Sequence, residues 1–180
     1  MKEISEFDKI VYHKIRDNVT TFIKRQANIF DSESTILLDI APQIHEGAKQ
    51  FFNESYILTA DIDKNSNADY IIDICENNEE KVPTETFNVI VCTEVLEHTL
   101  NPFSAINEIY RLLKWDGVLL MSTPFDFRIH GPLPDCWRFT EHGLKVLLRD
   151  FEIMEINALE NADRFLMPLH YTIVAKKMKK

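Results

Sequence analysis

The chain has little glycine, little cysteine and no long apolar run, and each shortage narrows what the protein can be. Only four of its 180 residues are glycine and three are cysteine. Cys75, Cys92 and Cys136 are an odd, widely spaced set, which predicts reduced thiols and argues against a disulfide framework or a CxxC-type metal site. No apolar run has the length needed to cross a bilayer, so we expect no membrane insertion.

Positive charge is also scarce. The chain has 29 acidic and 20 basic residues, a formal net charge of −9. Phosphate binding depends on clustered Lys and Arg, so we expect no nucleic-acid partner. Residues 1–19 are charged throughout and lack the apolar core of a signal peptide, which predicts a cytoplasmic protein.

Two signatures of catalytic chemistry are missing as well. The sequence contains no HxxxH, HxH or Cys/His cluster, so we expect no metal site. It contains no GxSxG elbow, which argues against a nucleophilic hydrolase.

The apolar pattern predicts a single α/β domain over residues 1–180. Residues 1–30 hold an N-terminal helix, whose apolar stripe, at three- and four-residue spacings, would run from Phe7 to Ile23. From residue 35 to 176, short β-branched runs alternate with helical segments, the first of them at residues 48–52. This rhythm predicts a mainly parallel sheet with helices on both faces.

Two later helices have identifiable start signals. Asn101 can cap one helix, with Pro102 in its first turn, and Thr140 can cap another that runs over about residues 141–149. Residues 116–117, Asp-Gly, would turn the chain into the next strand. The buried face of the first of these helices would comprise Phe103, Ile106, Ile109 or Tyr110, and Leu113.

Acidic residues follow successive predicted strands. Asp39, Asp61 and Asp73 each come at a strand end, and Thr93 and Glu94 follow the fourth strand. Ligands of open α/β sheets bind at this edge, and Asp61 follows Asp39 by 22 residues, close to the spacing of an acid that receives ribose hydroxyls. Aspartates at strand ends also make turns, and that alternative stands for each one alone.

These elements carry a family resemblance. In order, the segments "LLDIA", "LTADID", "IIDIC", "FNVIVCTEVLEH", "NPFSAINEIYRLLKWDGVLLMSTP" and "HGPLPDCWRFTEHGL" resemble the class I Rossmann-like methyltransferases that use S-adenosyl-L-methionine (SAM). The similarity is greatest to the small bacterial branch that modifies small molecules or saccharides. It covers about residues 35–176 and is most specific over 87–144.

The resemblance implies a fold, a cofactor and a set of cofactor residues. The fold is a Rossmann-like three-layer sandwich with a seven-stranded, mostly parallel sheet, in which "LHYTIVA" is the one antiparallel strand. The product would be S-adenosyl-L-homocysteine. The implied contacts are Asp39, Ile40, Ala41, Pro42 and Gln43 at the methionine part, Asp61 at the ribose, Ile62, Asp73 and Ile74 at the adenine, and Cys92, Thr93 and Glu94 on the path to the methyl group.

The loop after the first strand departs from the family pattern. Its glycine positions hold Ala41, Gln43 and His45, whereas glycines would let the backbone approach the cofactor. Ala41 is still small, and Gly47 follows one turn later. We expect an altered loop that still binds SAM, with an emptied site as the alternative.

The segment "FDFRIHGPLPDCWRFT" predicts a loop over a pocket, because it is long and holds titratable, aromatic and cationic groups. We assign the acceptor to His130, Asp135, Trp137 and Arg138, and catalysis to His98, His130 and Arg138. The alternatives are core packing for Trp137, an ion pair with a nearby Asp for Arg138, and structural roles for both histidines.

The sequence thus predicts methyl transfer from SAM to an oxygen or nitrogen of a small polar acceptor, such as a saccharide or a cell-surface precursor. The acceptor would be covered by the N-terminal helix and the His130 to Arg138 loop, or by the second subunit of a homodimer. Two alternatives remain open. One is a catalytically silent methyltransferase-like subunit that binds a partner, and the other is a different nucleotide-using Rossmann-like enzyme.

Overall fold

One mixed sheet forms the centre of the molecule. In the computed structural model, which describes residues 4–42 and 46–179, seven strands lie in the order β3-β2-β1-β4-β5-β7-β6. β1 (Ile36–Ile40), β2 (Tyr56–Asp61), β3 (Tyr70–Ile71), β4 (Phe87–Thr93) and β5 (Leu113–Pro124) run parallel. β7 (His170–Lys177) runs antiparallel to its neighbours β5 and β6 (Phe151–Leu159). The expected Rossmann-like sheet with one antiparallel strand is confirmed.

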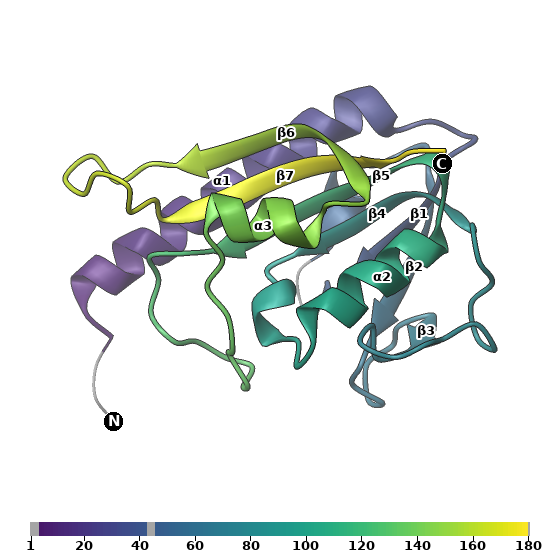
Figure 1. Cartoon of the computed structure of the whole chain (residues 1–180), viewed down its shortest axis with the longest axis horizontal. Coiled ribbons are helices and arrows are strands. Elements are labelled where there is room, and N and C mark those ends of the chain that lie inside the picture. Colours follow the sequence, from purple (N-terminus) through teal and green to yellow (C-terminus); the bar gives the residue numbers. More distant parts are fainter. Residues whose placement is uncertain (1–3, 43–45, 180) are drawn as a thin grey trace.

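One long helix, α1 (Glu6–Phe30), covers one face of the sheet and lies behind the sheet in Figure 1. Ser5 caps α1 by accepting a hydrogen bond from the amide of Asp8. The predicted apolar stripe is buried from Val11 to Ile23 and packs on alternate residues of the central strands. The prediction for Phe7 is wrong: its side chain is 57% exposed, because the first turns of α1 extend past the sheet.

The opposite face carries α2 (Pro102–Leu112) and α3 (Glu141–Leu147), which lie in front of the sheet in Figure 1. Both predicted caps are present: the Asn101 side chain accepts from the amide of Ser104, and Thr140 accepts from the amide of Gly143. Helices therefore lie on both faces of the sheet, which gives the three layers expected of this fold.

Three local predictions differ from the structure. Phe103 is 49% exposed, because the buried face of α2 is centred on Ala105, Ile106 and Ile109. The predicted helix at residues 48–52 is only a short 3₁₀ turn, η1 (Gly47–Gln50), whose amides bond to carbonyls three residues back. Residues 116–117 lie within β5, which begins directly after α2.

The strand order places a crevice at one edge of the sheet. β1 and β4 are neighbours, and the order reverses between them, so the connections that leave their carboxyl ends diverge. η2 (Leu96–His98) directly follows β4 at this edge. Open α/β sheets bind their ligands at such a point.

Candidate functional site

Three adjoining cavities lie at this edge. The helix cavity, of about 190 Å³, is bounded by α1, Thr93, Glu94 and His130. The wide cavity, of about 800 Å³, is bounded by Lys49, Thr59, Asp61 and Asp63. The apolar cavity, of about 340 Å³, is bounded by Ile40, Ile72, Asp73, Ile74 and Leu100. Because Ala41, His98 and Pro132 line all three, the cavities meet at these residues.

The altered loop after β1 keeps the backbone shape that glycine would favour. Ala41 has a φ of +51° and Gly47 a φ of +54°, both in the left-handed region. A Cβ atom on Gly47 would lie 2.2 Å from a carboxylate oxygen of Asp39, so a larger residue cannot fit there without a shift. The same oxygen accepts a hydrogen bond of 2.7 Å from the amide of Ala48, and burial raises the pKa of Asp39 to about 6. Gln43 and His45 lie outside the described residues.

The acidic residues after β2 and β3 lie beside the apolar cavity. Asp61 and Ile62 line both this cavity and the wide cavity, so the carboxylate marks the boundary between them. One oxygen of Asp61 accepts from the amide of Asp63, and one oxygen of Asp73 accepts from the amide of Cys75. A carboxylate has about four acceptor positions, so both groups can accept further hydrogen bonds from a ligand.

The three residues predicted to line the path to the methyl group separate in the structure. Cys92 is fully buried in the core under α2, where burial raises the pKa of its thiol, and it is not among the described residues that line the cavities. Thr93 and Glu94 line the helix cavity. Only these two of the three lie where a cofactor or an acceptor could reach them.

Glu94 is fixed by a chain of polar contacts that the sequence did not predict. One of its oxygens accepts from Ser122 at 2.8 Å and lies 2.7 Å from Nε2 of His170. Nδ1 of the same imidazole lies 2.9 Å from the Asn18 amide nitrogen, which can only donate, so Nε2 carries the proton that His170 donates to Glu94. Burial raises the pKa of Glu94, but the contacts with His170 and Ser122 lower it by more. The net pKa of Glu94 therefore lies below its ordinary value.

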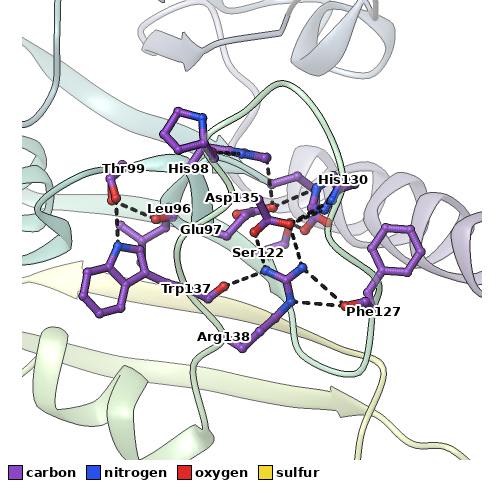
Figure 2. Close-up of polar contacts among 12 residues, drawn as sticks. Leu96, Glu97, His98, Thr99, Ser122, Phe127, His130, Asp135, Trp137 and Arg138 are labelled. Carbon is purple, nitrogen blue, oxygen red and sulfur yellow. Dashed lines mark hydrogen bonds and ion pairs between the residues drawn. The ribbon is translucent and has the colours of Figure 1, made fainter.

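The side chains of Glu97, His98 and His130 lie close together next to Glu94 and its partners (Figure 2). The Glu97 side chain is fully buried, and neither of its oxygens has a hydrogen-bond partner among the described residues. Its Oε1 lies 3.7 Å from Nε2 of His98 and 3.6 Å from Nε2 of His130. Burial and the nearby Glu94 raise the pKa of Glu97 to about 7, and the Glu97 carboxylate raises the pKa of His130.

The remaining predicted acceptor residues hold the loop after β5 together. Arg138 forms a two-pronged ion pair with Asp135 and donates to the carbonyls of Arg128 and Trp137, as Figure 2 shows in part. Asp135 also accepts from the amide of His130 at 3.0 Å. Trp137 donates to the carbonyl of Thr99 and stacks on Phe139. The alternative roles weighed for Arg138 and Trp137, an ion pair and packing, match this geometry.

The structure therefore divides the predicted site residues into two groups. Asp135, Trp137 and Arg138, like Cys92, are not among the cavity-lining residues in the described part of the chain. Those that line the connected cavities are Asp39, Ile40, Ala41, Pro42, Asp61, Ile62, Asp73, Ile74, Thr93, Glu94, His98 and His130. No sequence signal points to His170 or Ser122, because only the folded sheet brings β5 and β7 next to Glu94.

The fold occurs in solved structures of low sequence identity. The [4+2]-cyclase SpnF matches with a TM-score of 0.68 and 15% identity, over 91% of this chain and 81% of that one. A 1,6-didemethyltoxoflavin-N1-methyltransferase from Burkholderia thailandensis, crystallised with 1,6-didemethyltoxoflavin and S-adenosylhomocysteine, matches with a TM-score of 0.64 and 16% identity, over 93% and 84%. At this identity the likeness shows the fold alone.

Sequence comparison identifies the family to which the chain belongs. A ubiquinone biosynthesis O-methyltransferase of Actinobacillus pleuropneumoniae serotype 7 is 35% identical over 86 residues, 48% of this chain. The chain spans 34% of that relative's length, and 16–20% of three others with the same name. The described residues include no helix that is long and apolar enough to cross a membrane. The methyltransferase-domain family matches residues 7–155, and because that is most of the chain, the protein belongs to this family of enzymes, which take their methyl group from SAM.

Proposed function

We propose that this protein transfers the methyl group of SAM to an oxygen or nitrogen of a small polar acceptor, such as a saccharide or a cell-surface precursor. The observation that carries the proposal is the junction of the three cavities, where His98 lines every one of them. An acceptor in the helix cavity and a cofactor in the other two would meet there.

The described residues fit the parts of SAM. The apolar cavity suits the adenine, since Ile40, Ile62 and Ile74 offer flat apolar contact. Asp61, at the boundary with the wide cavity, suits the paired ribose hydroxyls, because a carboxylate accepts two hydrogen bonds side by side. The left-handed backbone at Ala41 leaves room for the methionine part, so the altered loop can still serve.

The helix cavity suits the acceptor. SAM supplies a methyl group on a sulfonium, so the protein's contribution is to align the acceptor and to handle its proton. Thr93 and Glu94 line this cavity from the strand ends, and Tyr12 and Arg16 line it from α1. A volume of about 190 Å³ favours a small acceptor or one end of a larger molecule.

The named relatives support an oxygen or a nitrogen as the atom that is methylated. One is an O-methyltransferase and another an N-methyltransferase, and each name applies to that protein. A silent binding subunit is the second candidate. It is favoured by Ala41 at a glycine position.

Calorimetry followed by an activity screen tests the proposal. The full chain is titrated with S-adenosylhomocysteine, and release of S-adenosylhomocysteine from SAM is then measured with a panel of small hydroxyl and amino compounds. Binding together with release that depends on one acceptor class supports an enzyme. Binding without release by any acceptor favours the silent subunit, and an absence of binding contradicts the enzyme and leaves only the silent subunit with an emptied cofactor site.

A further inference from the structure

Glu97 is a buried acid whose hydrogen-bonding capacity is unused. It is fully buried, and both carboxylate oxygens are without a hydrogen-bond partner in the part of the chain that the structure describes. Buried carboxylates are normally hydrogen-bonded, paired with a cation or bound to a metal. Among the described residues, Glu97 has only two long contacts, of 3.7 Å and 3.6 Å, with the imidazoles of His98 and His130. Its oxygens can therefore bind a further group that the protein chain itself does not supply.

Two imidazole nitrogens face this carboxylate at informative distances. His98 Nε2 and His130 Nε2 lie 3.7 Å and 3.6 Å from Oε1 of Glu97, too far for a good hydrogen bond. Neighbouring ligands around a tetrahedral Zn²⁺ with bonds of about 2.0–2.2 Å lie about 3.4 Å apart. The three ligand atoms all lie within 4.8 Å of one another, so a small contraction would bring them around one ion.

The His98 ring is oriented as metal ligands usually are, and the His130 ring lies beside a carboxylate. His98 Nδ1 lies 2.8 Å from the carbonyl oxygen of Pro134, which can only accept, so the proton is on Nδ1 and Nε2 has a free lone pair. His130 Nδ1 lies 3.0 Å from the carboxylate of Asp135 without forming a hydrogen bond of good geometry, so for this ring only the distance places a carboxylate behind the imidazole. A carbonyl or carboxylate behind each imidazole is the common outer shell of a metal site, and Arg138 fixes the Asp135 carboxylate.

We propose that Glu97, His98 and His130 bind a divalent transition-metal ion such as Zn²⁺ or Mn²⁺, with a coordination position open to an oxygen or nitrogen of the methyl acceptor. Two imidazoles and one carboxylate suit these ions better than Mg²⁺ or Ca²⁺, which prefer oxygen ligands. His98 and His130 line the helix cavity, so the open position lies on the acceptor side. The role of the ion rests on the proposed methyl transfer; the ion site itself does not.

The ion changes the role of the two histidines. A hydroxyl of the acceptor that binds the ion loses its proton to water more readily. Its oxygen then uses a lone pair to form the bond to the methyl carbon while the carbon–sulfur bond breaks, which leaves S-adenosylhomocysteine. His98 and His130 are then ligands and not proton acceptors. No short sequence motif signals this site, because His130 is 32 residues from His98.

Metal binding to the full chain tests the inference. Protein treated with a chelator and then dialysed is titrated calorimetrically with Zn²⁺, Mn²⁺ and, for comparison, Mg²⁺. We expect one Zn²⁺ or Mn²⁺ per chain, and binding at least about tenfold weaker in Glu97→Gln and His130→Ala. His142→Ala removes an exposed histidine of α3 and should stay within about twofold of the parent. No binding by the parent, or equal binding by all four proteins, would overturn the site.

Two further measurements keep the result interpretable. If Glu97→Gln fails to fold by circular dichroism, Co²⁺ is added to the parent and to His98→Ala, and the visible spectrum of a nitrogen-coordinated ion should appear in the parent alone. Identical spectra contradict the proposal. S-adenosylhomocysteine binding is measured on the metal-free parent: a protein that binds it but no metal refutes the metal site alone, and the reverse result refutes the proposed transferase function alone.

Discussion

Two buried aspartates show how differently the two loops at the site are held. Burial raises the pKa of Asp39, before the loop after β1, to about 6, and the contact that opposes this most is the amide of Ala48. Asp135, in the loop after β5, is buried too, but hydrogen bonds from Arg138 and from the amide of His130 lower its pKa to about 2. One carboxylate resists ionisation, whereas the other is held as an anion.

The difference follows from what each loop has to present. The loop after β1 would offer its backbone to a ligand, which requires small residues and left-handed φ values such as those of Ala41 and Gly47. The loop after β5 places His130 at the helix cavity, and the pair of Asp135 with Arg138 holds the backbone amide of that residue.

Removing the Arg138 guanidinium from the loop after β5 should have the largest effect on stability. Arg138→Ala leaves the fully buried carboxylate of Asp135 without its ion pair, and we expect the free energy of unfolding to fall by about 3 kcal/mol. Urea denaturation measures the loss. The exposed pair of Lys145 with Glu141 is the matched control, because Lys145→Ala should cost less than about 1 kcal/mol. Equal losses in the two variants would contradict a special role for Arg138.

The pKa of Asp39 predicts a dependence of stability on pH. Because its pKa in the folded protein, about 6, lies above the ordinary 3.8, this group stabilises the fold below about pH 4 and loses that contribution as the pH rises through 6. The loss corresponds to at most about 3 kcal/mol. Asp39→Asn lacks this titrating group. Its free energy of unfolding should therefore rise relative to that of the parent as the pH increases from 4 to 7. Urea denaturation across this range checks it, and a constant difference would refute the assignment.

Asp61→Ala tests the proposed contact between Asp61 and the ribose of the cofactor. Loss of a charged acceptor for the ribose hydroxyls should weaken S-adenosylhomocysteine binding by about 1.5–3 kcal/mol, or about 10- to 150-fold. Calorimetry measures the dissociation constant, with Glu33→Ala as an exposed acidic control. Folded Arg138→Ala should bind within about twofold of the parent, since Arg138 is not among the described residues that line the cofactor cavities. An unchanged constant in Asp61→Ala would place the ribose elsewhere.

The smallest effect is expected at Ala41. A φ of +51° costs an L-residue about 1–2 kcal/mol, which Ala41→Gly would relieve, while the extra freedom of glycine in the unfolded chain offsets about 0.5–1 kcal/mol. We expect a gain in stability of about 0.5 kcal/mol, measured by urea denaturation, and unchanged S-adenosylhomocysteine affinity. Ala41→Val, which places a branched side chain in the same conformation, should lower both, and tight binding by that variant would remove the loop from the cofactor site.

The fold was largely predictable because its signals are local. Alternating apolar runs specify strands, and the side chains of Asn101 and Thr140 satisfy amides only three residues away. Predictions failed where burial depends on the partner surface. Phe7 has the spacing of the buried stripe but extends past the sheet, and Phe103 lies at the margin of the buried face of α2.

The site was less predictable because its contacts join distant segments. The strand-end aspartates Asp61 and Asp73 could be placed from the topology, since parallel strands end at the same edge. The meeting of His98 with His130, however, depends on the path of the loop after β5. The partners of Glu94, Ser122 and His170, likewise come from the two strands β5 and β7, and no short sequence motif predicts such long-range contacts.

The hydrogen bond between Glu94 and His170 has a consequence for the order in which the enzyme forms. His170 begins β7, the last strand, which inserts between β5 and β6. While the chain is being synthesised, α1, β1 and β4 can emerge and pair, yet Glu94 has no imidazole until residue 170 has left the ribosome. Such long-range contacts form late. The nascent protein would therefore pair β1 with β4 before Glu94 acquires its imidazole, and both the sheet and the contacts of Glu94 would be complete only with β7.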